Sequence, residues 1–208
     1  MVSGLLFAAA LGAADIDPVN AAIERYQAVE SYQLTLRSSS GGNESEIIHY
    51  YYKKPGFVRM EFSQPFSGAV LVYSPSTKEI RLRPFGALKF PVFTLSPESR
   101  MAHSSSGHRV DRSDVGSLLQ NVKTLQENGA TEIMGEEEVG GRQALHIAIS
   151  GRDNFSVEGV HRYDLWLETR TLWPLKVASH DTKNVLIETV LMNDLQINPV
   201  FPDDFFNP

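Results

Sequence analysis

Two histidines and two aspartates occur close together near the middle of the chain: His103, His108, Asp111 and Asp114. Imidazole and carboxylate groups bind zinc and also exchange protons in acid–base catalysis. Their spacing matches no standard metal site, and the neighbouring serines lack the strand–turn–helix context of a nucleophile. Aspartate is a preferred helix cap, and an apolar periodic segment follows Asp114. We therefore predict a polar loop leading into a capped helix, with no catalytic residue, metal or cofactor. A metal or acid–base site is the alternative.

The composition argues against several other classes of function. The chain has 208 residues, a formal net charge of −6 and no cysteine, so it can form neither disulfides nor a lipidated N-terminal cysteine. It has no basic stripe, and Lys53-Lys54 is too small a cluster for a nucleic acid. The acidic run over residues 136–138 predicts a solvated strand edge, with a partner-docking patch as the alternative.

The first 14 residues are apolar or small, and Gly12-Ala13-Ala14 before Asp15 satisfies the small-x-small rule for signal-peptide cleavage. This stretch is too short to span a bilayer. No basic residue precedes it, so a helix that stays on the protein is the alternative. We expect a signal peptide over residues 1–14, a single domain over residues 15–208, and a soluble periplasmic protein.

The first half of the chain predicts a helix followed by a meander of strands. Asp17-Pro18 is a helix start, and apolar residues at helical spacing extend it over residues 18–30. The apolar period then changes to two. The resulting strands, separated by turn residues, are 32–37, 46–53, 57–63, 69–73 and 79–83. Short strands at such regular spacing are typical of an antiparallel sheet.

The second half repeats this layout after a long interruption. Prolines, glycines and a serine run predict a loop over residues 84–111, and a second helix begins at Ser113 or Asp114, with Gly129 as its C-terminal cap. The strands that follow are 132–139, 144–150, 161–168, 173–180 and 185–197. The fold class is therefore mainly β (α+β).

The last strand is apolar on both faces, which indicates a covered sheet or an apolar cavity. Two helices with one apolar stripe each can cover only part of about ten strands. We therefore predict a hydrophobic pocket on the uncovered part of the sheet. For some of the candidate residues, packing in an ordinary hydrophobic core is the alternative. The candidate lining residues are Tyr50, Tyr52, Met60, Phe62, Leu71, Tyr73, Leu82, Phe85, Phe90, Phe93, Trp166 and Trp173.

Two groups of residues could act at the rim of this concavity. Phe85, Phe90 and Phe93 lie in a predicted loop that contains several prolines. Their apolar character would be explained if the loop were a lid over the cavity or an edge that faces a membrane. Lys53, Lys54 and Arg59 flank a strand near the predicted rim. They are candidates for binding a partner protein or an anionic head group, with a plain surface role as the alternative.

Three stretches carry a resemblance to a known family. They are the opening helix running into residues 31–36; residues 52–62 followed by 70–73; and residues 165–167 and 173–177 with the closing segments 181–184 and 198–205. The most distinctive string is Lys54-Pro55-Gly56 followed by Arg59. In these stretches the chain resembles the LolA/LolB/RseB superfamily of periplasmic lipoprotein carriers and sensors.

The resemblance implies an unclosed antiparallel half-barrel of about 10–11 strands under short helices, with a hydrophobic cavity. It implies a carrier for the acyl chains of lipoproteins or lipids, because each buried methylene contributes about 0.8 kcal/mol without any specific polar contact. An inner-membrane release complex and an outer-membrane receptor would be its partners, and we expect a monomer. A sensor that regulates a membrane partner is the alternative function.

Overall fold

The structure is a computed structural model that describes residues 17–41, 43–84, 91–99, 103 and 109–207. The predicted signal peptide, Phe85, Phe90 and His108 lie outside the described residues. Two α-helices and eleven strands are described. They are α1 (Pro18–Gln27), β1 (Ser31–Ser40), β2 (Asn43–Lys53), β3 (Phe57–Gln64), β4 (Val70–Ser74), β5 (Glu79–Arg83), β6 (Phe93–Leu95), the 3₁₀ turn η2 (Val110–Arg112), α2 (Val115–Glu127), β7 (Gly129–Val139), β8 (Arg142–Gly151), β9 (Arg162–Glu168), β10 (Pro174–His180) and β11 (Leu186–Ile197).

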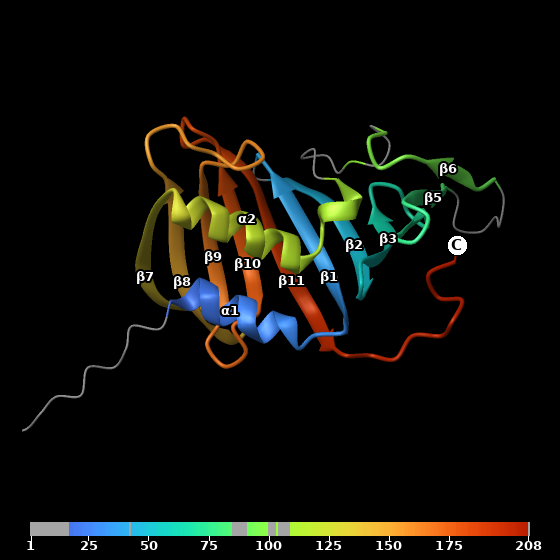
Figure 1. Cartoon of the computed structure of the whole chain (residues 1–208), viewed down its shortest axis with the longest axis horizontal. Coiled ribbons are helices and arrows are strands. Elements are labelled where there is room, and N and C mark those ends of the chain that lie inside the picture. The colour runs from blue at the N-terminus through green and yellow to red at the C-terminus, as the bar shows by residue number, and fades with distance from the viewer. Residues whose placement is uncertain (1–16, 42, 85–90, 100–102, 104–108, 208) are drawn as a thin grey trace, which may run out of the picture.

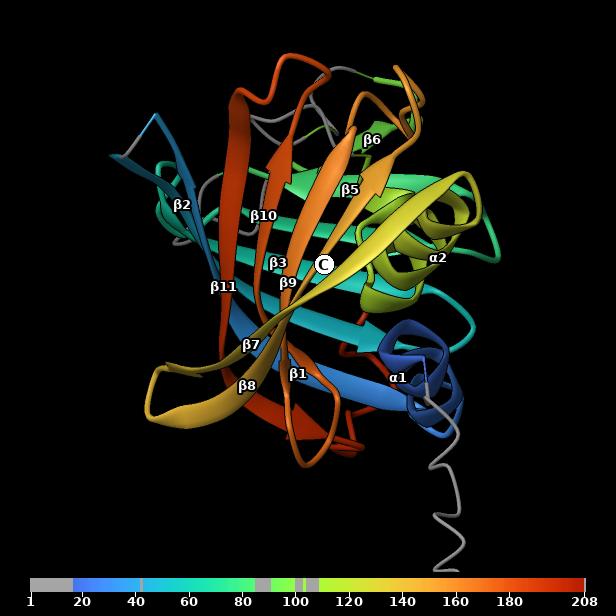
Figure 2. The ribbon, with the colours of Figure 1, turned by 90° about the vertical axis from the view of Figure 1, so that its left-hand side faces the viewer.

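All eleven strands form one antiparallel sheet in the order β6-β5-β4-β3-β2-β1-β11-β10-β9-β8-β7. Each half of the chain is a meander of sequential strands, and β1 pairs with β11 to join the halves, from Tyr32 opposite Ile197 to Ser39 opposite Thr189. Among the described strands, β6 and β7 form the two edges and do not pair with each other. Figures 1 and 2 show a strongly curved sheet. The predicted open antiparallel half-barrel is confirmed.

The helix starts follow the capping chemistry expected from the sequence. The Val19 amide donates to Asp17 Oδ1 at 3.0 Å, and Asp114 accepts from the amides of Gly116 and Ser117 at 2.8 and 3.2 Å. The C-terminal ends of both helices differ from the prediction, and α1 ends at Gln27 rather than at residue 30. Asn128 is the C-cap of α2, and Gly129 opens β7, where an added Cβ would lie 2.0 Å from the Ser150 carbonyl oxygen. The glycine is therefore required by the close approach of β8.

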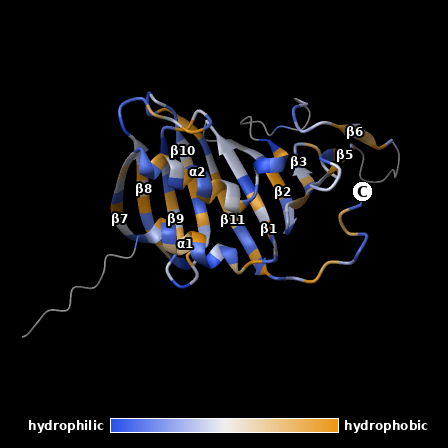
Figure 3. Ribbon diagram, in the orientation of Figure 1, coloured by the Kyte–Doolittle hydropathy of each residue, from blue (hydrophilic) through white to orange (hydrophobic). Residues whose placement is uncertain are grey.

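Both helices lie on the concave side of the sheet, in front of the strands of the second half and β1 (Figure 1). Their buried apolar face includes Val19, Leu119 and Leu125, which pack in one core with Ile147 and Leu165. Figure 3 shows apolar and polar residues alternating along the central strands, as expected of strands with one buried face. Neither α-helix lies in front of the β2–β5 part of the concave face in Figure 1.

The convex face carries a polar network around Asp164 on β9. His146 lies between two carboxylates: its Nδ1 is 2.9 Å from Glu137 Oε1 and its Nε2 is 3.0 Å from Asp164 Oδ1. Arg162 Nε donates to Asp164 Oδ2 at 2.7 Å. Burial alone would raise the pKa of Asp164, but the hydrogen bonds and charges of Arg162 and His146 outweigh it and lower the pKa below its ordinary value.

We expect Asp164 to contribute stability at neutral pH and to lose that contribution in acid. A carboxyl whose pKa is lowered by folding stabilises the native state above its unfolded pKa, here 3.8, and stops doing so as the pH falls through the lower native pKa. Asp164→Asn should therefore lower the free energy of unfolding by about 2 kcal/mol at neutral pH. The loss in the free energy of unfolding that Asp164→Asn causes, measured by urea titration, should become smaller as the pH is lowered.

The matched control is Asp153→Asn, because Asp153 is exposed. This control should leave the unfolding curves unchanged at every pH. An Asp164→Asn deficit that is equally large at neutral and acid pH would contradict the assignment, because it would mean that the carboxylate charge makes no contribution.

Candidate ligand-binding cavity

A cavity of about 660 Å³ lies on the concave face, bounded by strands of both halves and by η2 and the first turns of α2. Its volume falls within the range of small-molecule sites. Most of its lining is apolar. The apolar lining side chains include Leu36, Ile48, Met60, Phe62, Leu71, Leu82, Val110, Leu118, Val177, Val190 and Met192.

The strand register explains why these side chains form a continuous surface. Met192 pairs with Leu36, Leu36 with Ile48, and Ile48 with Phe62, so one apolar row crosses β11, β1, β2 and β3. A second row runs from Met60 through Leu71 to Leu82. Residues directly opposite each other in an antiparallel sheet share a face. The two-residue period of each strand therefore predicts which face of the sheet a side chain occupies. The pairing register between strands then aligns the apolar side chains of that face into continuous rows.

Next to the cavity, tyrosines hold the start of α2, where Ser113 and Asp114 line the apolar space. The Tyr26 hydroxyl donates to Asp114 Oδ1 at 3.0 Å, and the Tyr32 hydroxyl accepts from the Val115 amide at 3.0 Å. Tyr50 Oη lies 3.1 Å from Ser113 Oγ. Burial raises the pKa of all three tyrosines well above 10, so they remain neutral hydrogen-bonding groups. We call Tyr26, Tyr32, Tyr50 and Tyr52 the tyrosine wall.

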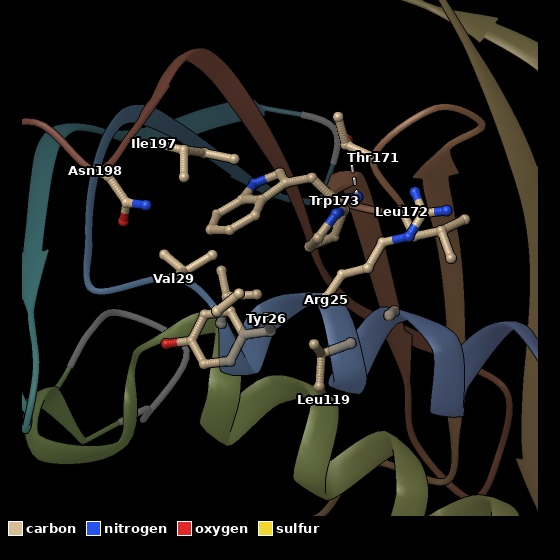
Figure 4. Close-up of a pocket in the computed structure, with 13 residues that line it drawn as sticks. Arg25, Tyr26, Val29, Leu119, Thr171, Leu172, Trp173, Ile197 and Asn198 are labelled. Atoms are coloured by element: carbon tan, nitrogen blue, oxygen red, sulfur yellow. Dashed lines mark hydrogen bonds between the residues drawn. The ribbon is translucent and has the colours of Figure 1, made fainter.

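A smaller pocket of about 300 Å³ lies between α1, the start of α2 and the β9–β10 turn. Figure 4 shows Arg25 and Tyr26 from α1 on one side of it and Trp173 and Ile197 on the other. Trp173 is buried, and its ring packs edge-on to Tyr32 with 4.9 Å between centroids. This volume is less than half that of the larger cavity, which is therefore the better candidate for a ligand with a long chain.

The predicted lining residues separate into groups. Met60, Phe62, Leu71 and Leu82 line the larger cavity, and Trp173 lines the smaller pocket. Tyr50 and Tyr52 line neither cavity, because both are packed in the buried core as part of the tyrosine wall. Tyr73 packs against the core, and Phe93, which is 46% exposed, pairs with Leu82 at the sheet edge. Phe93 lies on the short strand β6, where the sequence predicts a loop.

Trp166 is a correction to the predicted cavity set. Leu165 and Leu167 belong to the main buried core, so Trp166 between them points to the convex face. There its ring stacks on His146 at 4.1 Å between centroids and lies beneath Lys176 Nζ at 3.9 Å. Trp166 therefore packs on the side of the sheet away from the cavity.

Two of the three predicted partner-binding cations make contacts within the chain. Lys54 Nζ donates to the Gln27 carbonyl at 2.7 Å and to Glu30 Oε1 at 3.0 Å, which ties the end of α1 to β2. Arg59 pairs with Glu61 at 2.6 Å and donates to the Phe205 carbonyl at 2.8 Å. Lys53 is exposed at the end of β2. These contacts give Lys54 and Arg59 structural roles on the surface.

The described members of the histidine and aspartate cluster, His103, Asp111 and Asp114, have separate surroundings. Asp114 caps α2, and Asp111 accepts hydrogen bonds from Arg109 that hold the pKa of its carboxyl below the ordinary value. His103 lines the larger cavity. Within the part of the chain that the structure describes, no group of three or more histidine and acidic side chains could hold a metal ion.

The cavity also has a polar part that the sequence does not predict. Ser38, Glu46, Ser179 and Glu188 are buried and line it together. Ser38 Oγ donates a short hydrogen bond to Glu188 Oε1. Alternation along the strands could have identified them, because Ser38 and Glu46 occupy the same phase as Leu36 and Ile48.

The structure is an open half-barrel with an apolar concave cavity beneath helices. This is the architecture that the resemblance to the LolA/LolB/RseB-like superfamily implies. Residues 92–208, more than half of the chain, match the family model of the MucB/RseB N-terminal domain. The chain belongs to this family. A comparison with curated proteins finds no match.

Solved structures show the same fold at low sequence identity. The lipoprotein LppX of Mycobacterium tuberculosis is 10% identical, with a TM-score of 0.57 over 89% of this chain and 96% of that one. MucB in the MucA/MucB complex of Pseudomonas aeruginosa is 19% identical, with a TM-score of 0.51 over 92% of this chain. The present chain spans 60% of that MucB structure. No helix among the described residues is long and apolar enough to cross a membrane.

Proposed function

We propose that this protein binds acyl chains of lipoproteins or lipids in the periplasm, and that the larger cavity is the binding site. The observation that carries the proposal is the continuous apolar surface that the strand register builds around about 660 Å³ of space. Ten methylene groups buried there would contribute about 8 kcal/mol of gross transfer free energy. The MucB/RseB family match supports a location in the cell envelope.

The main candidate role is a carrier that shields acyl chains from water. In that role the protein would take its client from an inner-membrane release complex and deliver it to an outer-membrane receptor. No catalytic chemistry is needed, because transfer requires only differences in binding free energy between donor, carrier and acceptor.

The second candidate is a regulatory sensor, and the family match favours it. One structural neighbour is a complex of MucB with MucA from Pseudomonas aeruginosa. By analogy, an acyl chain in the cavity would act as an effector that changes the affinity for a membrane partner. Such coupling requires the ligand to bind one conformation more tightly than another.

The proposal is tested by titrating the protein with an uncharged monoacylglycerol that carries a fluorescent chain. We expect saturable uptake with a dissociation constant between about 1 μM and 1 mM, because the cost of association offsets part of the gross transfer free energy. Unlabelled monoacylglycerol should displace the probe. A protein that takes up no probe would contradict acyl-chain binding in either role.

Carrier and sensor are then separated by a transfer experiment. Protein loaded with the probe is mixed with acceptor vesicles, and the loss of the protein-bound signal is followed over time. A carrier should deliver the probe, whereas a sensor should retain it and change its affinity for a protein partner when loaded.

A further inference from the structure

Residues 199–207 follow β11 and run along the first half of the sheet, where they end beside β5 (Figure 1). We call this segment the C-terminal strap. Asn198 fixes its start, because the Asn198 side-chain carbonyl accepts hydrogen bonds from the amides of Glu30 and Ser31 at 2.8 and 3.2 Å. Ser31 Oγ also donates to the Pro199 carbonyl at 2.7 Å. The strap therefore leaves the body of the protein at a fixed point, the junction between α1 and β1.

Aromatic side chains hold the strap against the sheet. The Phe205 ring lies 5.0 Å from the ring of Tyr51 on β2, measured between centroids. The Phe206 ring lies 5.7 Å from that of Phe57 on β3. The Arg59 guanidinium lies 4.8 Å from the centroid of the Phe205 ring, and Arg59 Nη1 donates to the Phe205 carbonyl at 2.8 Å. Phe205 is therefore a main anchor of the strap, since both its ring and its backbone bind the sheet.

The strap contacts one row of side chains that crosses four strands. The row consists of directly opposed residues on β2, β3, β4 and β5, which share the convex face: Tyr51, Arg59, Val72 and Arg81. At the β5 end of the row, Arg81 Nη1 donates to Asn207 Oδ1 at 2.8 Å. Val72, between the two arginines, is only 2% exposed. Its burial on the outer face of the sheet is explained by a segment that covers this row.

The opposite face of the same strands belongs to the larger cavity. Each residue of the convex row has a sequence neighbour on the concave face: Tyr50, Met60, Leu71 and Leu82. The last three of these line the larger cavity. One stretch of backbone therefore carries both the strap contacts and the cavity lining, and close packing transmits a change of strand curvature from one face to the other.

We infer that the C-terminal strap positions the wall of the larger cavity. Docking of the strap holds β2 to β5 in the curvature at which their apolar side chains fit an acyl chain, and the bound chain in turn favours the docked strap. This inference rests on the proposed function, because the acyl chain is the ligand of that cavity. The coupling is reciprocal, so strap and ligand change each other's equilibrium by the same factor.

The first test measures binding of the uncharged fluorescent monoacylglycerol to Phe205→Ala. The substitution removes the ring that packs on Tyr51 and Arg59. We expect the affinity to fall about tenfold, a typical coupling between two sites of one protein. Val200→Ala is the matched control, because Val200 belongs to the same strap and is 96% exposed. It should leave the affinity unchanged.

The second test distinguishes coupling from a general loss of stability, and it uses the wild-type protein. The amides of Phe205 and Asn207 donate to backbone carbonyls within the strap at 3.0 and 2.9 Å. Saturating monoacylglycerol should slow hydrogen exchange at these two amides about tenfold, the same factor as in the first test. The reference is the Thr169 amide in the β9–β10 turn, which does not line the larger cavity and should exchange at an unchanged rate.

The outcomes separate this inference from the proposed function. Unchanged affinity in Phe205→Ala, an equal loss in Val200→Ala, or strap amides that do not respond to the ligand would each overturn the coupling and leave acyl-chain binding intact. If Phe205→Ala fails to fold in a thermal unfolding scan, the exchange rates of the wild-type protein decide the question. A wild-type protein that takes up no probe would contradict the proposed function itself.

Discussion

Replacing Val190 with tryptophan is expected to weaken acyl-chain binding about a hundredfold while the protein remains folded. Val190 on β11 lines the larger cavity, with Ser38 opposite it on β1 and Val177 opposite it on β10. An indole at this position would occupy space that the ligand needs. Displacing about four methylene groups costs about 3 kcal/mol, which corresponds to the expected change in the dissociation constant.

Thr189→Trp provides the control for this prediction. Thr189 is the next residue on the same strand, so its side chain points to the opposite face of the sheet. The same bulky side chain placed there should leave the affinity for the uncharged probe unchanged. Equal losses from Val190→Trp and Thr189→Trp would show that the tryptophan acts through stability rather than by filling the cavity.

Tyr32→Ala is expected to lower the free energy of unfolding by about 4 kcal/mol, the cost of removing a large buried aromatic side chain. Tyr32 is fully buried in the tyrosine wall. Its ring lies 5.0 Å from the ring of Tyr52 and 4.9 Å from that of Trp173, measured between centroids. Such a loss is a large fraction of the stability of a typical domain. Urea unfolding measures it directly.

Tyr32→Phe separates the packing of the ring from its hydrogen bond. The phenylalanine keeps the aromatic contacts but leaves the Val115 amide at the start of α2 without its acceptor. We expect a loss of about 1–3 kcal/mol and faster hydrogen exchange at that amide. Unchanged exchange at Val115 in the phenylalanine variant would contradict the role of Tyr32 in holding α2.

The sequence predicts the architecture well because local patterns determine most of it. The strand over residues 79–83 is predicted at the boundaries that the structure shows, since a two-residue period lies between clear turns. Asp17 and Asp114 mark both helix starts through capping chemistry that depends only on nearby backbone amides. The three-residue strand β6 is too short to show a period, so pattern analysis assigns it to a loop.

The candidate site is less predictable because it depends on register and on which face is concave. Met60 and Leu71 lie at the larger cavity, and the sequence can single them out because they are apolar and alternate along predicted strands. Trp166 does not line the cavity, because its position between the core residues Leu165 and Leu167 puts it on the opposite face, whereas its aromatic type alone favours a cavity. Glu46 and Glu188 are missed, since a charged residue in a strand is ordinarily assigned to the solvent face.

The most direct test of acyl-chain binding is native mass spectrometry of the protein purified from a periplasmic extract without detergent, followed by organic extraction of any ligand. The proposal predicts additional mass from a bound lipid or acylated peptide, and loss of that mass in Val190→Trp but not in Thr189→Trp. A wild-type protein that carries no such ligand, and that also fails to take up added monoacylglycerol, would contradict the central claim.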